Sequence, residues 1–340
     1  MKSDGMLWMH YLYLGENMWG DSPRPSKLYP AQCGAYYRRT NKINTDMDTW
    51  YRVVDQLPSF GINSILIDVG EGLKYDSHPE LAVDGSLTHD ELKKLLDYIR
   101  SLGMEPLPKL NFSACHDTWL GEYSRMVSTQ TYYQVAKDVI SEVCEVFGKP
   151  RLFHLGMDEE DYPDHHTSIT TIRSDDLWWH DLYFLFDEVE KHGARPWIWS
   201  DYFWKHQEGW EKKMPKDCVQ SNWYYDRMTP KGANGKYPQV AYQTYIEFAK
   251  MGYDQIPGTS DWNNRQNLAE TVWLWLTENI CDEHLLGFAT LPWEKTTDLN
   301  YYTHLNNANR MKYAKAMFEE YTPEKREEMC RRQSPRLIVK

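Results

Sequence analysis

Four consecutive acidic residues follow a short apolar segment near the middle of the chain. Residues 152–155 are too few for a helix and are rich in aromatic and branched side chains, which predicts a buried strand. Gly156 and Met157 separate this segment from the acidic residues 158–161. Like charges so close together repel, so at least one carboxyl pKa is expected to rise where the cluster is partly buried. A carboxylate pair at a strand end suits general acid–base chemistry, although a solvated acidic loop would have the same sequence.

Aromatic residues are the strongest compositional signal. They make up 14% of the 340 residues and include 15 Trp and 24 Tyr. Their rings combine an apolar face with a polar edge, which suits sugar rings that have apolar C–H faces and hydroxyl edges. The alternative explanation of the high aromatic content is that these rings fill a large hydrophobic core. The composition therefore favours a carbohydrate partner.

Charge and cysteine content narrow the possible partners. The net charge of −12 argues against a nucleic-acid partner and against an anionic membrane surface. No apolar run approaches the length of a membrane span. The six cysteines are irregularly spaced and contain no CxxC pair, which predicts free thiols in a reducing compartment. With no cleavage site of the secretory type near the N-terminus, we expect a cytoplasmic protein.

Strand-like and helix-like segments alternate along the chain. This alternation implies parallel strands joined by helical crossovers, and eight units fit a (β/α)8 TIM barrel of the α/β class. A doubly wound sheet is the alternative, but no Gly-rich phosphate loop follows the first strand, and no cofactor is expected. We predict one catalytic domain over residues 1–322 and a charged tail over 323–340. The predicted strands are 6–14, 62–69, 104–112, 152–156, 195–200, 219–225, 253–258 and 286–291. The predicted helices are 46–60, 88–102, 131–147, 174–192, 203–213, 243–250, 265–281 and 300–321.

Polar and aromatic residues gather where these strands end. In a (β/α)8 barrel the chemistry lies at the C-terminal ends of the strands, so these side chains should share one rim. Asp261 could instead cap the following helix. The concentration of acids beside aromatic rings predicts a carbohydrate site. In strand order the residues are Asp68 and Glu71; Lys109, His116 and Asp117; Asp158 and Glu159; Trp199 and Asp201; Asn222, Trp223 and Tyr224; Asp261 and Trp262; Trp293 and Glu294.

One motif resembles a known enzyme family. Residues 154–159, His-Leu-Gly-Met-Asp-Glu, resemble the H-x-G-x-D-E pattern on the fourth barrel strand of the family 20 glycoside hydrolases, the β-N-acetylhexosaminidases. Fainter similarities cover much of the barrel. His116 resembles the family's loop histidine, Trp199, Trp223 and Trp293 its pocket tryptophans, Tyr224 the tyrosine that binds the acetamido oxygen, and Glu294 an acid that holds sugar hydroxyls.

The chain also departs from the family pattern. Tyr-Leu-Gly-Glu at residues 13–16 stands where family members carry an arginine. Trp293 and Glu294 are adjacent, whereas the family separates them by one residue. The second-strand sequence at residues 68–71 differs as well. The resemblance thus implies the fold and the acid pair and leaves the sugar open.

The resemblance implies a mechanism for the acid pair. Glu159 would be the general acid, and Asp158 would orient the 2-acetamido group of the substrate, whose oxygen attacks the anomeric carbon. Tyr224 would polarise that group. If the substrate has no acetamide, another acid would serve as nucleophile or base, with Asp201, Asp261 and Glu294 as the candidates.

Two other classes of protein remain open at this point. A non-catalytic carbohydrate-binding barrel would need the tryptophans alone. A metal-dependent hydrolase or lyase would gather histidines and acids, but no HxH or HExxH spacing supports a metal, and none is expected. The candidate set for that reading is His78, His116, Asp117, His154 and Asp158.

The remaining polar residues near the motif have simpler expected roles. His154 is expected to be an interior histidine bonded to a neighbouring acid, although it is also a candidate for substrate binding. His116 and Asp117 form either a sugar-binding pair or a helix cap. Glu160 and Asp161 are expected to tune the local field or to face water. The sequence does not define the oligomeric state.

Overall fold

The computed structural model describes residues 5–15, 41–160, 173–228, 236–278, 280, 282–321 and 324–325. Most of the long loop between the first strand and the first helix, and most of the predicted tail, lie outside these ranges. Within them, no helix combines the length and the apolar character needed to cross a membrane.

Eight parallel strands form the centre of the molecule, in the order β6-β5-β4-β3-β2-β1-β8-β7. Parallel bridges Gln220–Gln255 and Trp223–Gly258 join the two ends of this order and close the barrel. The predicted (β/α)8 fold is therefore confirmed. The strands are β1 Leu7–Tyr13, β2 Ser64–Asp68, β3 Glu105–Lys109, β4 Leu152–His154, β5 Arg195–Trp199, β6 Val219–Ser221, β7 Gly258–Thr259 and β8 Gly287–Thr290.

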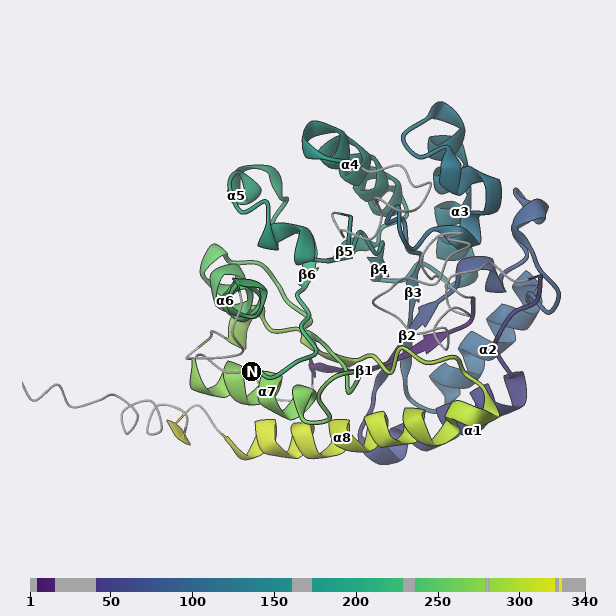
Figure 1. Ribbon diagram of the computed structural model, residues 1–340. Helices are drawn as coiled ribbons and strands as arrows, with labels where there is room; N and C mark the ends of the chain where they lie inside the picture. Colours follow the sequence, from purple (N-terminus) through teal and green to yellow (C-terminus); the bar gives the residue numbers. More distant parts are fainter. Residues whose placement is uncertain are drawn as a thin grey trace, which may run out of the picture.

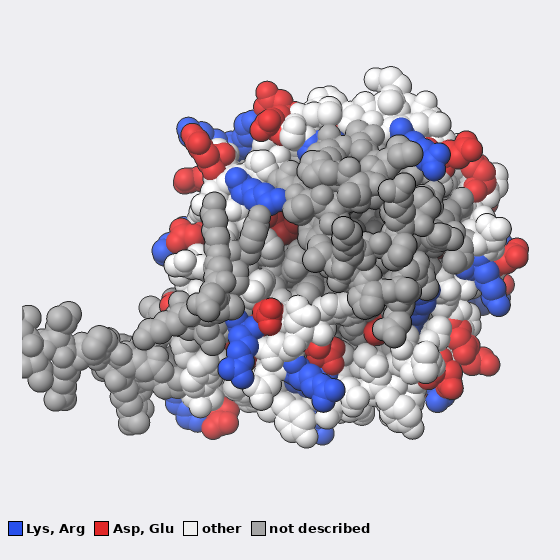
Figure 2. Space-filling view, in the orientation of Figure 1, with Lys and Arg blue, Asp and Glu red and all other residues white. Residues whose placement is uncertain are grey.

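The helices surround the barrel, as Figure 1 shows. Local sequence signals set several of their ends: Thr88 and Glu91, for example, form the predicted capping box at the start of α2. Figure 2, in the same orientation, shows acidic and basic side chains interspersed around the rim of this face. The helices are α1 Met47–Gln56, α2 His89–Ser101, α3 Gln130–Val146, α4 Asp175–Lys191, α5 Trp210–Lys213, α6 Lys236–Met251, α7 Asn267–Thr277 and α8 Tyr301–Glu320.

The seventh strand differs most from its prediction. The sequence predicts a strand over 253–258, whereas β7 contains only Gly258 and Thr259. Pro257 has no N–H to donate to a strand ladder, which interrupts regular pairing just before β7. Gly258 itself lies close to its neighbours, because a Cβ there would be 3.1 Å from atoms of Leu291 and Trp199. Residues 253–257 therefore contribute isolated bridges instead of a regular strand.

The alternation of side chains along the strands divides the core in two. On β2, Ile65 and Ile67 belong to the hydrophobic layer between barrel and helices, whereas Leu66 belongs to the barrel interior. Asp68 ends the strand on the interior side, where Lys109 Nζ and the Tyr11 hydroxyl both contact its carboxylate. Burial raises the pKa of Asp68, and Lys109 opposes that rise. This buried group fixes the ends of β1, β2 and β3 relative to one another.

Candidate active site

The chain turns sharply between β4 and the acidic residues. Gly156, Met157 and Glu159 all have left-handed backbone conformations, with φ of 75°, 71° and 57°. A Cβ at residue 156 would collide with the side-chain amide of Asn111, so only glycine fits there. Non-glycine residues rarely adopt such φ values, and surrounding contacts must hold them in place. The strained segment presents the Asp158 and Glu159 side chains at the C-terminal end of β4.

His116 links the two acids. Its Nε2 lies 3.2 Å from Asp158 Oδ2 and 3.0 Å from Glu159 Oε2. On the other oxygen of Asp158, Asn111 Nδ2 donates a hydrogen bond of 2.9 Å. Both His116 and Asn111 come from the segment that follows β3, so the ends of two adjacent strands build this pair.

The same contacts separate the pKa values of the two acids. Burial alone would raise the pKa of Asp158, but the charge and hydrogen bond of His116 hold it below its usual value. Burial raises the pKa of Glu159, and His116 only partly opposes this rise. Burial would also lower the pKa of His116, yet the charge of Asp158 raises it well above normal. One carboxylate is thus kept ionised beside an imidazolium, while its neighbour holds its proton more readily.

Asp201 connects this pair to β5 and β6. Its Oδ2 accepts a 2.8 Å hydrogen bond from the backbone N–H of Glu159, and its Oδ1 accepts one of 3.1 Å from Trp223 Nε1. Burial raises the pKa of Asp201 well above its usual value, and the charge of Asp158 adds to the effect. Asp201 thereby holds the backbone of Glu159 in its left-handed conformation.

Aromatic rings from four strand ends adjoin the acids. The Trp293 ring centroid lies 5.0 Å from that of Tyr11, 6.0 Å from Trp199 and 6.1 Å from Tyr225. Trp223 stacks on Tyr225 at 5.0 Å with an interplanar angle of 23°. Three of the four predicted tryptophans are therefore brought together, from the ends of β5, β6 and β8.

The tyrosine in this ring group is Tyr225, whereas the sequence pointed to Tyr224. Tyr224 instead packs against the hydrophobic layer between barrel and helices. Tyr225 packs with the barrel-interior residues, and its pKa is raised by burial and by the charges of Asp158 and Glu159. Alternation along extended backbone could have indicated this, because Trp223 and Tyr225 are two residues apart and Tyr224 points to the opposite side.

The other predicted residues of the seventh and eighth strand ends have different surroundings. Trp262 is 45% exposed and has no ring contact with the other site tryptophans among the described residues. Asp261 forms an ion pair with Arg310 and accepts a hydrogen bond from Asn307, so it ties the end of β7 to α8. Glu294 directly follows Trp293 and is partly buried.

His154 and Asp117 are both buried. His154 Nδ1 accepts a 3.0 Å hydrogen bond from the N–H of Gly156, and its ring lies 4.6 Å from Trp197 and 4.2 Å from Trp199. Its hydrogen-bond partner is thus the backbone, where the sequence suggested an acid. Asp117 precedes the 3₁₀ helix Thr118–Arg125, but its side chain makes no capping bond. Burial raises the pKa of Asp117 to about 8.

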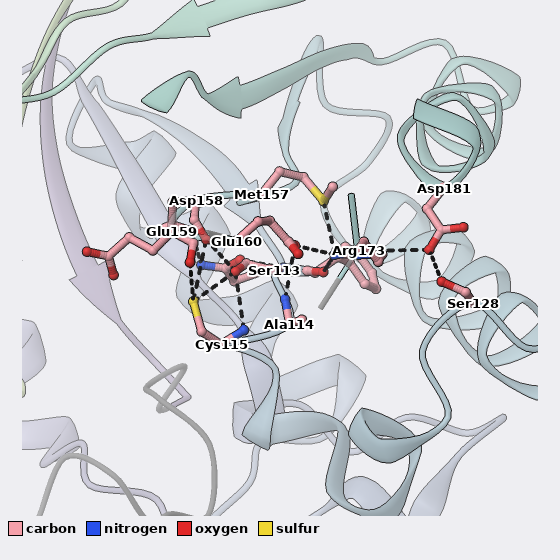
Figure 3. A network of polar contacts seen from close by, with 12 residues as sticks. Ser113, Ala114, Cys115, Ser128, Met157, Asp158, Glu159, Glu160, Arg173 and Asp181 are labelled. Carbon is pink, nitrogen blue, oxygen red and sulfur yellow. Dashed lines mark hydrogen bonds and ion pairs between the residues drawn. The ribbon is translucent and has the colours of Figure 1, made fainter. Parts of the chain in front are cut away.

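Glu160 is buried in an ion-pair network. Of its two expected roles, tuning the local field or facing water, the burial excludes the second. Figure 3 shows Arg173 between Glu160 and Asp181. Arg173 Nη2 lies 2.5 Å from Glu160 Oε1 and donates a 2.6 Å hydrogen bond to the carbonyl of Phe112, while its Nη1 lies 3.2 Å from Asp181 Oδ2. The backbone N–H of Ala114 also donates to Glu160. No pattern in the sequence pointed to Arg173, and Asp161 lies outside the described residues.

The group of potential metal ligands that comes together shares only His116 with the set that the sequence suggested. His78 pairs with Glu80 and Asp138 among the helices. Within the described ranges, the group with suitable ligand atoms close together is Cys115, His116 and Glu159.

Comparisons with known proteins agree with the barrel fold. No protein-family model matches the sequence, and no curated protein matches it. Solved structures of β-N-acetylhexosaminidases do match its fold. The enzyme from Bacteroides fragilis has 15% identity and a TM-score of 0.56, and the match covers 94% of this chain and 71% of that one. A GH20 enzyme from Streptomyces coelicolor has 13% identity and a TM-score of 0.58, covering 90% and 64%.

A third match comes from a complex with a sugar. The GH20 exo β-N-acetylglucosaminidase from Vibrio harveyi, solved with N-acetylglucosamine, has 13% identity and a TM-score of 0.59, covering 95% of this chain and 57% of that one. Against the second and third of these enzymes, the chain spans less than two thirds of their length. At these identities the comparisons establish the fold alone, a (β/α)8 barrel similar to that of these enzymes.

Proposed function

We propose that this protein is a retaining glycoside hydrolase that acts on 2-acetamido sugars with the assistance of the substrate's own acetamido group. The observation that carries the proposal is the acid pair Asp158 and Glu159, linked by His116 at the strand ends of a barrel of this fold. Two adjacent carboxyl groups with pKa values shifted in opposite directions are suited to different roles in one reaction.

Glu159 is the general acid in this proposal. Its raised pKa keeps it protonated closer to neutral pH, so it can donate a proton to the oxygen of the leaving group. Asp158 stays ionised and accepts a hydrogen bond from the acetamido N–H, which stabilises the positive charge as the acetamido oxygen attacks the anomeric carbon. In the second half of the reaction, the Glu159 carboxylate takes a proton from the water that opens the cyclic intermediate.

The ring group gives the sugar an apolar surface. Trp223 and Trp293 are only partly buried, and Trp223 Nε1 donates to Asp201 beside the acid pair. Tyr225, rather than Tyr224, is the tyrosine that we assign to the acetamido oxygen, because its ring lies with Trp223 and Trp293. Chemistry on sugars without an acetamide would need a further nucleophile. Asp201 is our candidate for that role, because its carboxyl accepts a hydrogen bond from the Glu159 N–H.

Aryl glycosides with and without a 2-acetamido group test this proposal. We expect hydrolysis only of the acetamido substrates and no loss of rate with a chelator. Glu159→Gln should lower kcat about 10²–10⁴-fold while substrate binding is kept. Glu122→Gln is the matched control, because Glu122 is exposed on the 3₁₀ helix Thr118–Arg125.

Two results would contradict the proposal. Unchanged activity of Glu159→Gln would remove the general acid from the mechanism. Sugar binding without turnover of any glycoside would favour a non-catalytic carbohydrate-binding barrel instead.

A further inference from the structure

A thiol lies beside the acid pair and has no role in the proposed reaction. Cys115 precedes His116 in the chain and is only 1% exposed. Its Sγ lies 3.0 Å from Ser113 Oγ and donates towards the carbonyl oxygens of Asp158 and Glu159 at 3.5 and 3.7 Å. A thiol, an imidazole and a carboxylate therefore meet at one point.

The spacing of these groups is close to that of a metal site. One ligand atom from each of Cys115, His116 and Glu159 lies within 4.8 Å of the other two. Zinc binds sulfur at about 2.3 Å and nitrogen or oxygen at about 2.0–2.2 Å, so tetrahedral donors lie about 3.4–3.6 Å apart. Side-chain movements of about 1 Å would bring the three atoms to those separations.

The surrounding charges also favour a cation. Asp158 adds a further carboxylate beside the same point, and its Oδ2 is 3.2 Å from the shared histidine. His116 now supplies the positive charge between Asp158 and Glu159. The Glu159 side chain is 18% exposed and that of Asp158 is 11% exposed. A cation from solvent can therefore reach the cluster past these two carboxyl groups.

We propose that Cys115, His116 and Glu159 form an inhibitory site for a thiophilic divalent cation such as Zn²⁺. Binding displaces one proton from the thiol of Cys115, one from the imidazolium of His116 and the proton that Glu159 holds as general acid, and all three protons pass to solvent. The bound cation occupies the carboxylate that would act as general acid, and so competes with substrate. The inhibition rests on the proposed function, whereas the cation binding does not.

Cobalt titration tests the site without any enzyme assay. A thiolate bound to Co²⁺ gives a charge-transfer absorption band in the near ultraviolet. We expect this band in the unchanged protein at one Co²⁺ per chain, with loss of the band when Zn²⁺ is added. Cys115→Ser should lose the band, and Cys144→Ser, which alters a buried thiol on α3, should keep it. Absence of the band from the unchanged protein, or its persistence in Cys115→Ser, would overturn the proposal.

Inhibition by Zn²⁺ tests the consequence for activity. Zn²⁺ should inhibit hydrolysis of an aryl N-acetylglucosaminide competitively, more strongly as pH rises, and a chelator should restore the rate. Cys115→Ser should keep its uninhibited rate, since a serine hydroxyl can donate to the same carbonyl groups. Its Zn²⁺ inhibition constant should rise by more than about tenfold, because even losing a group that only orients a ligand costs 10–100-fold in affinity.

The two experiments separate the metal site from the proposed function. A cobalt band that depends on Cys115, in a protein that hydrolyses no glycoside, would support the metal site and refute the hydrolase. Hydrolysis of the acetamido substrates without any cobalt band would support the hydrolase and refute the metal site. Equal Zn²⁺ inhibition of Cys115→Ser and the unchanged enzyme would also refute the site.

Discussion

Replacing Arg173 by methionine should destabilise the fold strongly. The Arg173 side chain and its partners Glu160 and Asp181 are all fully buried. Methionine fills much of the same volume but leaves both carboxylates without their cation. Arg173 also donates to the carbonyl of Phe112, so the change removes a contact between the segment after β3 and the segment after β4. The perturbation therefore acts directly on the chain that carries the acid pair.

The expected loss of folding stability follows from the burial of the charges. Removing one partner of a buried ion pair costs about 3–5 kcal/mol, because the other charge stays buried and uncompensated. The lost hydrogen bond to Phe112 is part of the same disruption. We therefore expect the free energy of unfolding to fall by about 3–5 kcal/mol in total. Kinetically, kcat should fall as well, because Glu160 directly follows the proposed general acid Glu159.

The effect should depend on pH in a defined direction. Burial already raises the pKa of Glu160 in the folded protein, and loss of Arg173 would raise it further. A carboxyl group whose pKa is higher in the folded than in the unfolded state favours folding more as pH falls. The loss of stability in Arg173→Met should therefore be largest at pH values above the raised pKa of Glu160 and should shrink as pH falls through it.

Urea unfolding at several pH values measures this effect, provided that the m-value is unchanged. Lys250→Met is the matched control, because the Lys250–Glu247 pair on α6 is exposed and such pairs contribute only about 0.3–0.5 kcal/mol. The double variant Glu160→Gln/Arg173→Met should be less destabilised than the sum of its single changes. A loss below about 1 kcal/mol in Arg173→Met would refute the reasoning.

Three further predictions concern the acid pair and its neighbours. Gly156→Ala should lower stability by more than about 1 kcal/mol and abolish most activity, because its Cβ would collide with Asn111; urea unfolding and kcat measure both. The kcat/KM of the unchanged enzyme should fall as pH rises through the raised pKa of Glu159, since the general acid must be protonated; a pH profile without this alkaline fall would contradict the assignment. Tyr225→Phe should lower kcat/KM about tenfold for acetamido substrates, whereas Tyr224→Phe should leave it nearly unchanged; equal effects would refute the choice between them.

The fold could be predicted from the sequence because its signals are local. Strands such as β2 have runs of branched apolar residues, and helices such as α2 have capping residues and apolar residues at helical spacing. Eight alternating strand and helix units allow few topologies, because the connections between parallel strands share one handedness. The position of Asp158 and Glu159 followed from the same argument, because every strand of such a barrel ends on the same side. The local signals gave wrong boundaries at β7, where Pro257 interrupts the ladder, and also at β6, α5 and α6.

The surroundings of the acid pair depended on tertiary structure. His116 reaches Asp158 and Glu159 across more than 40 residues of sequence, and Arg173 reaches Phe112 across 61. Such contacts depend on loop paths and side-chain directions, which no local pattern encodes. The sequence alone therefore determined the barrel and the strand end that carries the acids. Tertiary packing alone decided that the pKa values of Asp158 and Glu159 shift in opposite directions, that Glu160 is buried, and that Cys115 lies beside the acids. Each of these depends on which side chains, distant in sequence, exclude water from the strand end.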